Sequence, residues 1–378
     1  MKVEFFRHDL TQDDIERVSG VLRSTFLTTG PVTERFEKDF SRYTGLAHVV
    51  GLNSCTAALH LSLLALGIGP GDEVITTPMT FIATATAIMH AGAKPVFIDV
   101  EKDSGLMDVS KIEAAITART KAIIPVHLYG SMVDMRGLRK IAERFHLKVI
   151  EDAAHCIEGT RDGYRPGQLS DAVCYSFYAT KNMTCGEGGA VATEDSDLAQ
   201  AVRCLRLHGM SKDAATRYKG KYQHWDMARL GWKYNMHDIS AALLIGQIPR
   251  LDKNLQHRQT ICRLYDKELS KIESIQIPQS KGISARHLYT IWVDPEKRDR
   301  LLHGLHAKGI GVAVNYRAVH TLSFFRKAFS YKAHDFPNAY NIGRRTLSLP
   351  LYPQLSKSQI NYVIESVKSI LSEKRITH

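Results

Sequence analysis

The sequence lacks several patterns that would assign it to a class at once. Its six cysteines include no Cys-x-x-Cys pair, and no group of His, Cys and carboxylate residues has metal-ligand spacing. We therefore expect reduced thiols in a cytoplasmic protein, with no disulfide and no bound metal. No apolar run reaches the roughly 18 residues of a membrane span, and the charged start, Met1 to His8, does not resemble a signal peptide.

The common nucleotide-binding motifs are also absent. No Gly-x-x-x-x-Gly-Lys-Ser/Thr loop occurs, and the glycines between Gly67 and Asp72 follow a helix-like segment, which is typical of a helix end. Lys and Arg number 50 against 39 Asp and Glu, a net charge of +11 with neutral His. Without a basic run or a nucleic-acid motif, this charge indicates scattered surface residues or attraction to anions such as phosphates, and no nucleic-acid partner.

What the sequence does contain is an alternation of two patterns. Short apolar segments predict strands at residues 48–51, 73–77, 94–99, 120–126, 147–151, 171–177 and 189–193. Helical spacing predicts helices at residues 12–24, 31–43, 56–66, 81–91, 108–116 and 134–145. Alternating strands and helices predict an α/β fold with a mostly parallel central sheet flanked by helices.

The pattern changes near residue 250. We expect a large ligand-binding domain at residues 1–250 and a smaller C-terminal α+β domain at residues 251–378. A helical run extends from about residue 236 to 269, followed by strands at 287–293 and 310–316 and helices at 297–308 and 356–371. Residues 208–230 are polar and predict a long exposed loop, which in a compact domain is more often functional or interfacial than idle.

Two charged residues follow neighbouring predicted strands. Asp152 comes after the strand at 147–151, and Lys181 lies in the loop after the strand at 171–177. The carboxyl ends of parallel strands meet at one edge of a sheet, where ligands bind. The segment Gly51 to Ala58 reaches the same edge and opens a helix, whose free amides suit a phosphate.

Each of these features alone has an ordinary explanation. A lysine after a strand is usually a solvated surface charge, and an aspartate there is often a helix cap. Together, an amine, a carboxylate and a phosphate site indicate an aldehyde cofactor that carries a phosphate. Pyridoxal phosphate (PLP) needs all three, because an amine holds its aldehyde and a carboxylate keeps its ring nitrogen protonated.

At this point the chain resembles a known family, the sugar-nucleotide aminotransferases of the DegT/DnrJ/EryC1/StrS group, which are fold-type-I PLP enzymes. The similarity runs from Leu27 to Pro353. Its blocks are Ala65 to Ile75, Ile124 to His127, Ile150 to His155, and Lys181 with Gly186 to Gly189.

The resemblance implies a role for each matching residue. Lys181 matches the lysine that bonds to the cofactor aldehyde, and Asp152 matches the carboxylate at the pyridine nitrogen. Phe81 matches the aromatic residue that stacks on the ring. Two residues that pack against the ring are matched by Ala154 and His155. The contacts to the cofactor phosphate are matched by Thr56, Ala57 and Ser176.

The chain departs from the family pattern in one segment that reaches the neighbouring subunit's cofactor phosphate. Many members read Gly-x-Asn-x-Arg there, whereas this chain reads Gly231-Trp232-Lys233-Tyr234-Asn235. Lys233 could supply an ammonium to the phosphate or could be a surface residue. The variant is similar to the branch that aminates UDP-4-keto sugars, although Asn315 replaces a family histidine. The resemblance therefore implies a homodimer with shared active sites, with cofactor contacts from Lys233 and Asn235.

We expect a transaminase that moves an amino group from L-glutamate to a keto carbon, C4 by the resemblance, of a nucleotide-linked sugar in lipopolysaccharide or related glycan synthesis. Substrate contacts are expected from Thr29, Tyr178, Tyr316, Arg317 and His320. A sugar dehydratase of the same family would carry His in place of Lys181. A non-catalytic regulator on the same scaffold would be expected to lose Lys181 or Asp152, and this chain has both.

Overall fold

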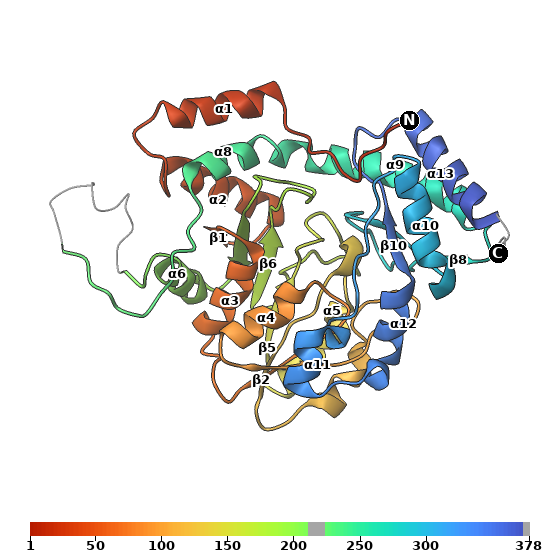
Figure 1. The fold of residues 1–378 in the computed structure, drawn as a ribbon. Helices are drawn as coiled ribbons and strands as arrows, with labels where there is room; N and C mark the ends of the chain where they lie inside the picture. The colour runs from red at the N-terminus through yellow and green to blue at the C-terminus, as the bar shows by residue number, and fades with distance from the viewer. Residues whose placement is uncertain (211–223, 373–378) are drawn as a thin grey trace.

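The structure is a computed structural model that describes residues 1–210 and 224–372 (Figure 1). Most of the loop predicted at residues 208–230 therefore lies outside the described residues. In the described part, no helix is both long enough and apolar enough to cross a membrane.

A seven-stranded sheet forms the centre of the described chain. Its strands follow the order β1-β7-β6-β5-β4-β2-β3. Their bounds are β1 His48–Leu52, β2 Glu73–Thr76, β3 Lys94–Phe97, β4 Thr120–Ile123, β5 Lys148–Asp152, β6 Ala172–Ser176 and β7 Gly189–Thr193. Every neighbouring pair between β3 and β6 is parallel, and only β7 runs against its neighbours β6 and β1. The predicted mostly parallel sheet is confirmed.

The antiparallel strand has a consequence for the edge where ligands bind. A parallel connection needs a crossover, whereas β6 and β7 are joined by the short segment 177–188. This segment leaves the carboxyl end of β6 and returns at that same end, because Ser176 pairs with Gly189. It therefore stays at the edge where β5 ends in Asp152.

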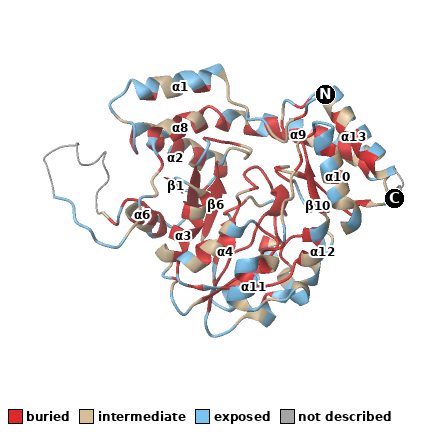
Figure 2. Ribbon diagram, viewed as in Figure 1, coloured by how far each residue is buried: buried red, intermediate tan, exposed pale blue. Residues whose placement is uncertain are grey.

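Helices cover both faces of the sheet, as the red core between the layers in Figure 2 shows. Their bounds are α1 Gln12–Leu22, α2 Pro31–Thr44, α3 Cys55–Ala65, α4 Ile82–His90, α5 Met135–Arg144, α6 Ser196–Leu205 and α8 Asp238–Ile245. The strands alternate between two cores: Val49 packs on the face of α2, α5 and α8, and Val50 on the face of α3, α4 and α6. This two-residue period places the strand residues on both buried faces.

Local sequence signals explain several helix ends. Thr11 and Asp14 form a reciprocal capping box at the start of α1. Pro31 opens α2, and Gly45 ends it with φ 77°, a left-handed conformation that glycine adopts without strain. Asp134 caps α5 by accepting from the amide of Gly137.

The C-terminal part is built on a second, three-stranded sheet in the order β10-β9-β8. Its strands are β8 Ile275–Gln276, β9 Tyr289–Val293 and β10 Thr346–Leu349, and its helices are α9 Leu251–Leu269, α10 Pro295–Ala307, α11 Ser323–Phe329, α12 Pro337–Arg345 and α13 Lys357–Ser372. The start of the chain joins this part, because Val3 bridges to Ile310. Figure 1 accordingly shows the N-terminus beside α9 and α13. The domain boundary at residue 250 stays a prediction.

Some predicted elements are wrong. Residues 310–316 form only isolated bridges, from Ile310 to Val3 and from Ala313 to Ser348. The helix predicted at 108–116 is two 3₁₀ helices, η1 Val109–Lys111 and η2 Glu113–Ala115. Neither segment forms the repeated hydrogen bonds of a strand or an α-helix. The spacing of apolar residues in the sequence does not show whether those bonds form. Further 3₁₀ helices are η3 Leu128–Gly130, η4 Ile248–Arg250, η5 Val319–Thr321 and η6 Ala333–Asp335.

Candidate active site

A cavity of about 530 Å³ opens at the carboxyl edge of the large sheet. It brings together residues from β5, the β6–β7 connection, the start of α3 and the segment before α4. The predicted site residues that line it are Thr56, Phe81, Asp152, Ala154, His155, Ser176, Tyr178, Lys181 and Tyr316. The sequence separates these residues widely, and the sheet topology joins them.

Asp152 lies at the floor of this cavity and is 5% exposed. Its Oδ2 accepts a hydrogen bond of 2.7 Å from Thr84 Oγ1, and its Oδ1 accepts one of 3.1 Å from the amide of Ala154. Burial raises the pKa of Asp152, although these two hydrogen bonds and the charge of Lys181 oppose the rise. A cation placed against the carboxylate would stabilise its ionised form, which burial disfavours.

Thr84 is a site residue that the sequence reasoning missed. It donates to Asp152 and lies 2.8 Å from the hydroxyl of Thr80, which therefore donates to Thr84. The available signal was weak, since Thr80 lies just before α4 and Thr84 in its first turn, where two residues four apart can meet. The Thr80–Thr84 pair fixes the direction of the Asp152 side chain.

Lys181 faces the same cavity from the β6–β7 connection. Burial lowers the pKa of Lys181 to about 8, and the nearby Cys55 and Asp152 oppose the shift. A lysine with this pKa holds a useful fraction of neutral amine near neutral pH. The side chain can therefore act both as a nucleophile and as a base.

The start of α3 forms the opposite end of the cavity. Ser54 caps the helix and accepts from the amide of Ala57 at 3.0 Å, so that amide, which we expected at the phosphate, is used within the helix. The amide of Thr56 belongs to the first turn, which has no acceptor inside the helix. Gly189 packs against this turn, because an added Cβ there would lie 2.4 Å from the nitrogen of Cys55.

Aromatic rings line the mouth and one wall of the cavity. Phe81 is 54% exposed and Tyr178 is 45% exposed, unusually open for apolar rings. Tyr316 lies 5.6 Å from Phe81, measured between ring centroids. His155 accepts from the amide of Tyr129 at Nδ1, so its Nε2–H donates to the Tyr316 hydroxyl at 3.0 Å. Burial holds the pKa of His155 well below its usual range, and the ring is neutral.

Other predicted site residues lie outside this cavity. Asn235 donates to Thr29 Oγ1 at 2.7 Å and accepts from Lys233 Nζ at 2.6 Å, which joins three predicted residues in one cluster. The cluster runs beside the strand that leads into α3, because Asn235 bridges to Leu52. The cluster thus lies near the segment that leads into α3, without lining the cavity.

Arg317 and His320 are also placed away from the cavity lining. Arg317 is exposed and follows Tyr316 in the chain. His320 is fully buried, with Nε2 donating to the carbonyl of Ala333 at 3.0 Å and the ring packed 5.0 Å from Phe336. A residue that no sequence pattern indicated, Phe5, lines the cavity instead.

The cavity fits PLP on three observations. The buried Asp152 carboxylate needs a cation, which a protonated ring nitrogen supplies. The open face of Phe81 offers a flat apolar surface for a ring. The first turn of α3, against which Gly189 packs, offers a phosphate the amide of Thr56, which has no acceptor inside the helix. Among the described residues, no group of His, Cys and carboxylate side chains is arranged to hold a metal.

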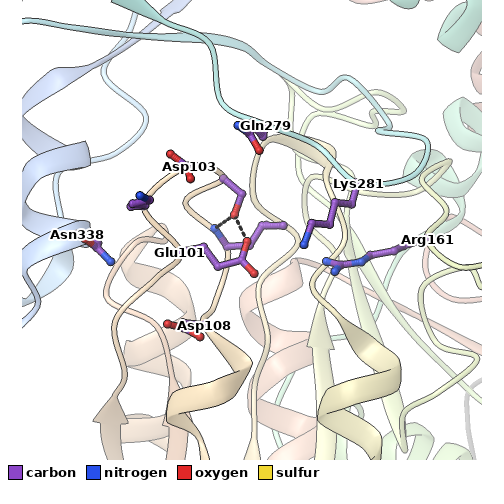
Figure 3. A pocket seen from close by; sticks show the side chains of 10 residues that line it. Glu101, Asp103, Asp108, Arg161, Gln279, Lys281 and Asn338 are labelled. Carbon is purple, nitrogen blue, oxygen red and sulfur yellow. Dashed lines mark hydrogen bonds between the residues drawn. The ribbon is translucent and has the colours of Figure 1, made fainter.

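A second cavity, of about 420 Å³, shares no lining residue with the first (Figure 3). Charges of both signs surround it: the acidic Glu101, Asp103 and Asp108, and the basic Lys102, Arg161 and Lys281. Ser104 Oγ donates to Glu101 at 2.6 Å. Because the charges balance, this cavity favours neither an anion nor a cation.

Comparison with known proteins agrees with the geometry of the first cavity. The profile of the DegT/DnrJ/EryC1/StrS aminotransferase family matches residues 8–368. The spore coat polysaccharide biosynthesis protein SpsC of Bacillus subtilis (strain 168) is 43% identical over 368 residues, which are 95% of this chain and 95% of that protein.

Solved structures are similar over almost the whole chain. Spr1654 of Streptococcus pneumoniae in its PLP-form has a TM-score of 0.91 and 32% identity, covering 98% of both chains. PseC of Helicobacter pylori, an aminotransferase involved in the biosynthesis of pseudoaminic acid, has a TM-score of 0.91 and 27% identity, covering 98% of this chain and 99% of its own.

Proposed function

The chain belongs to the DegT/DnrJ/EryC1/StrS aminotransferase family and is a PLP-dependent transaminase, and from this premise we propose that it aminates a nucleotide-linked keto sugar. L-Glutamate is the proposed amino donor, and C4 of the sugar is the proposed acceptor carbon. When bound, PLP supplies an aldehyde that carries the amino group and a protonated ring that withdraws electrons.

Lys181 and Asp152 have different proposed roles at the cofactor. Lys181 holds the aldehyde, and once the donor amine has released it, its Nζ takes and returns the proton at the substrate carbon. A pKa of about 8 suits both roles near neutral pH. Asp152 keeps the ring nitrogen protonated, because burial makes a cation partner favourable for its carboxylate.

The remaining predicted residues are proposed to orient the cofactor. Phe81 would cover one face of the ring, and Ala154 and His155, which line the same cavity, would pack against it as well. The phosphate is proposed to bind at the start of α3, where Thr56 lines the cavity together with Ser176 at the end of β6. Ala57 supports this end indirectly, since its amide holds the cap of Ser54.

The sugar is proposed to enter past the aromatic rings. Tyr178, Tyr316 and Phe5 line the open part of the cavity and offer apolar faces and hydroxyl groups. Arg317 follows Tyr316 and is exposed, so its charge is available to a pyrophosphate. His320 is retained only as an indirect contact, through the segment it holds in place. A UDP sugar is proposed because the segment around Lys233 is similar to the branch that uses UDP-4-keto sugars.

The observation that carries the proposal is the meeting of Lys181 and Asp152 in one cavity. The test is to incubate the protein with glutamate and a panel of UDP-, dTDP- and GDP-linked 4-keto sugars, and to detect the amino sugar by mass. Lys181→Ala should lose both turnover and the covalent attachment of the cofactor, which is detected in the wild type by the protein mass after borohydride reduction. A wild-type protein that aminates none of the sugars would defeat the proposed substrate class.

A homodimer with shared active sites is part of the proposal. The cluster of Thr29, Lys233 and Asn235 lies outside the chain's own cavity, as expected for residues that act across an interface. Mixed dimers of Lys181→Ala and Lys233→Ala chains test this at limiting cofactor. If Lys233 serves the partner's phosphate, one site in each mixed dimer is intact and activity returns. If it serves its own chain, no site is intact and activity stays lost.

The rival functions lack support in the chain. A dehydratase of the family would carry His at position 181, and a regulator would not need the intact pair of Lys181 and Asp152. The cytoplasmic location and the pathway, lipopolysaccharide or another surface glycan, stay predictions.

A further inference from the structure

A line of hydrogen-bonded polar side chains begins directly beside Lys181, at the half-buried Asn182, and runs into the buried interior. Asn182 is the next residue of the β6–β7 connection, and its amide nitrogen donates to Glu158 Oε2 at 2.9 Å and to the carbonyl of Ala285 at 3.0 Å. Its amide oxygen lies 3.2 Å from His287 Nδ1. The side chain thus makes contacts in two directions away from the cavity.

The chemistry of the partners fixes which way this amide faces. A carboxylate and a carbonyl only accept, so the Asn182 nitrogen must face them and its oxygen must face His287. His287 therefore carries its proton on Nδ1 and donates. Asn182 uses both donors and one acceptor, which leaves its side chain a single well-bonded orientation.

The line continues to a buried ion pair. Glu158 Oε1 accepts a hydrogen bond of 2.6 Å from Arg258, which also donates to the carbonyl of Ala285 at 3.2 Å. Glu158 and Arg258 are each 2% exposed. Because a buried charge without its partner is costly, this pair resists rearrangement and gives Asn182 a rigid support.

At its other end the line returns to the cavity. The rings of His287 and His155 lie 4.4 Å apart between centroids, and His155 lines the cavity. Burial, with the charges of Lys181 and Arg258, holds the pKa of His287 well below its usual range. Asn182, on the same connection as Lys181, thus links that connection to His287, whose ring packs against His155.

These residues come from separate parts of the chain. Glu158 follows β5, Asn182 lies between β6 and β7, Arg258 is on α9, and His287 precedes β9. We propose that Asn182 is a positioning residue for Lys181, held by Glu158 and Arg258 so that the amine and the His155 ring keep a fixed relation to the cofactor. The inference rests on the proposed function, in which Lys181 is the cofactor lysine.

The first test removes the amide with Asn182→Ala and compares the holoenzymes. We expect kcat to fall about 10- to 100-fold, as for a reacting group displaced by roughly 1 Å, with KM for either substrate changed by less than about threefold. The pH midpoint of the cofactor's visible absorbance should rise by about one unit, since a loosened Lys181 regains solvent.

A matched control separates positioning from simple stability. Asn254 is buried and, like Asn182, donates to a carboxylate, Asp9 Oδ2 at 2.8 Å, but it lies outside the cavity lining. Asn254→Ala should lower the melting temperature while kcat per bound cofactor and the spectral midpoint stay at wild-type values. Equal kcat losses in the two variants would overturn the positioning role.

A second test exchanges donor and acceptor. Asn182→Asp sets two carboxylates against each other, and its kcat deficit should shrink at low pH, where a shared proton restores the hydrogen bond. Adding Glu158→Gln to this variant supplies a donor that faces the new carboxylate and returns the net charge to that of the wild type. The kcat of the double variant should be about tenfold higher than that of Asn182→Asp alone. Additive losses in the double variant would contradict the direct pairing.

The variants also distinguish a failure of the proposed function from a failure of the positioning role of Asn182. If Lys181→Ala still turns over, or still holds the cofactor covalently after borohydride reduction, the proposed function fails whatever Asn182 does. If Lys181→Ala loses turnover and covalent attachment while Asn182→Ala keeps wild-type kcat and spectral midpoint, the proposed function stands and the positioning role is wrong.

Discussion

The hydroxyl of Thr84 offers a test of how the site controls Asp152. Thr84→Val removes the donor that lies 2.7 Å from Asp152 Oδ2 while keeping the shape of the side chain. A hydrogen bond to a charged group contributes about 1.5–3 kcal/mol, which favours the ionised carboxylate by about 1–2 pKa units. Burial already raises the pKa of Asp152, and the substitution should raise it further.

The sign of the effect on activity follows from the role of the carboxylate. The ionised form is the one that keeps the ring nitrogen protonated, and it is lost as the pH falls through the pKa of Asp152. A higher pKa moves that loss to higher pH. The rate of the glutamate half-reaction in Thr84→Val should therefore approach that of the wild type at high pH and fall increasingly below it as the solution becomes more acidic.

The assay is the single-turnover change in cofactor absorbance after mixing with glutamate, measured across a pH series. Thr86→Val is the matched control, because Thr86 is on the same helix and donates only to the carbonyl of Ala83. The reasoning is refuted if Thr84→Val shows a deficit that does not depend on pH, or if Thr86→Val shows the same deficit.

Two further predictions concern the ends of the cavity. Because burial lowers the pKa of Lys181 to about 8, the rate of PLP rebinding to cofactor-stripped protein should rise about tenfold per pH unit below that value and level off above it. A rate still climbing toward the range of an ordinary lysine would contradict this. Gly189→Ala would place a Cβ 2.3 Å from the carbonyl carbon of Ser54, so we expect cofactor affinity, measured by absorbance titration, to weaken by more than about tenfold. Gly20→Ala, where nothing lies within 4 Å, should leave the affinity unchanged.

The regular elements of the large sheet were accessible from the sequence for a clear reason. Strands buried on both faces are short apolar runs, and helices such as α2 carry their own start and stop in Pro31 and Gly45. The C-terminal part was less accessible. Its strand β10 and helix α11 have no signal of comparable strength, although Pro337 opens α12 as Pro31 opens α2, and the run at 310–316 is apolar without pairing as a strand.

The residues of the candidate site also differ in how far the sequence alone indicates them. Asp152 and Lys181 could be selected because each follows a buried strand, and the segment at Thr56 because it joins a strand to a helix. Thr84 and Phe5 could not, since their relevance depends on which distant residue they meet. Ala57 was expected at the phosphate, yet its amide is taken by Ser54, a local bond that competes with any ligand.

By itself, the sequence determined the alternation of strands and helices, the amine and carboxylate after two of those strands, and the resemblance that links them to PLP. These features depend on local pattern and residue type, which are present in the sequence before the chain folds. Only the tertiary structure decided that β7 runs antiparallel, which keeps Lys181 at the edge where Asp152 ends β5. It also decided that Asn182 joins Glu158 and His287, because contacts between residues distant in sequence exist only after the sheet has ordered them.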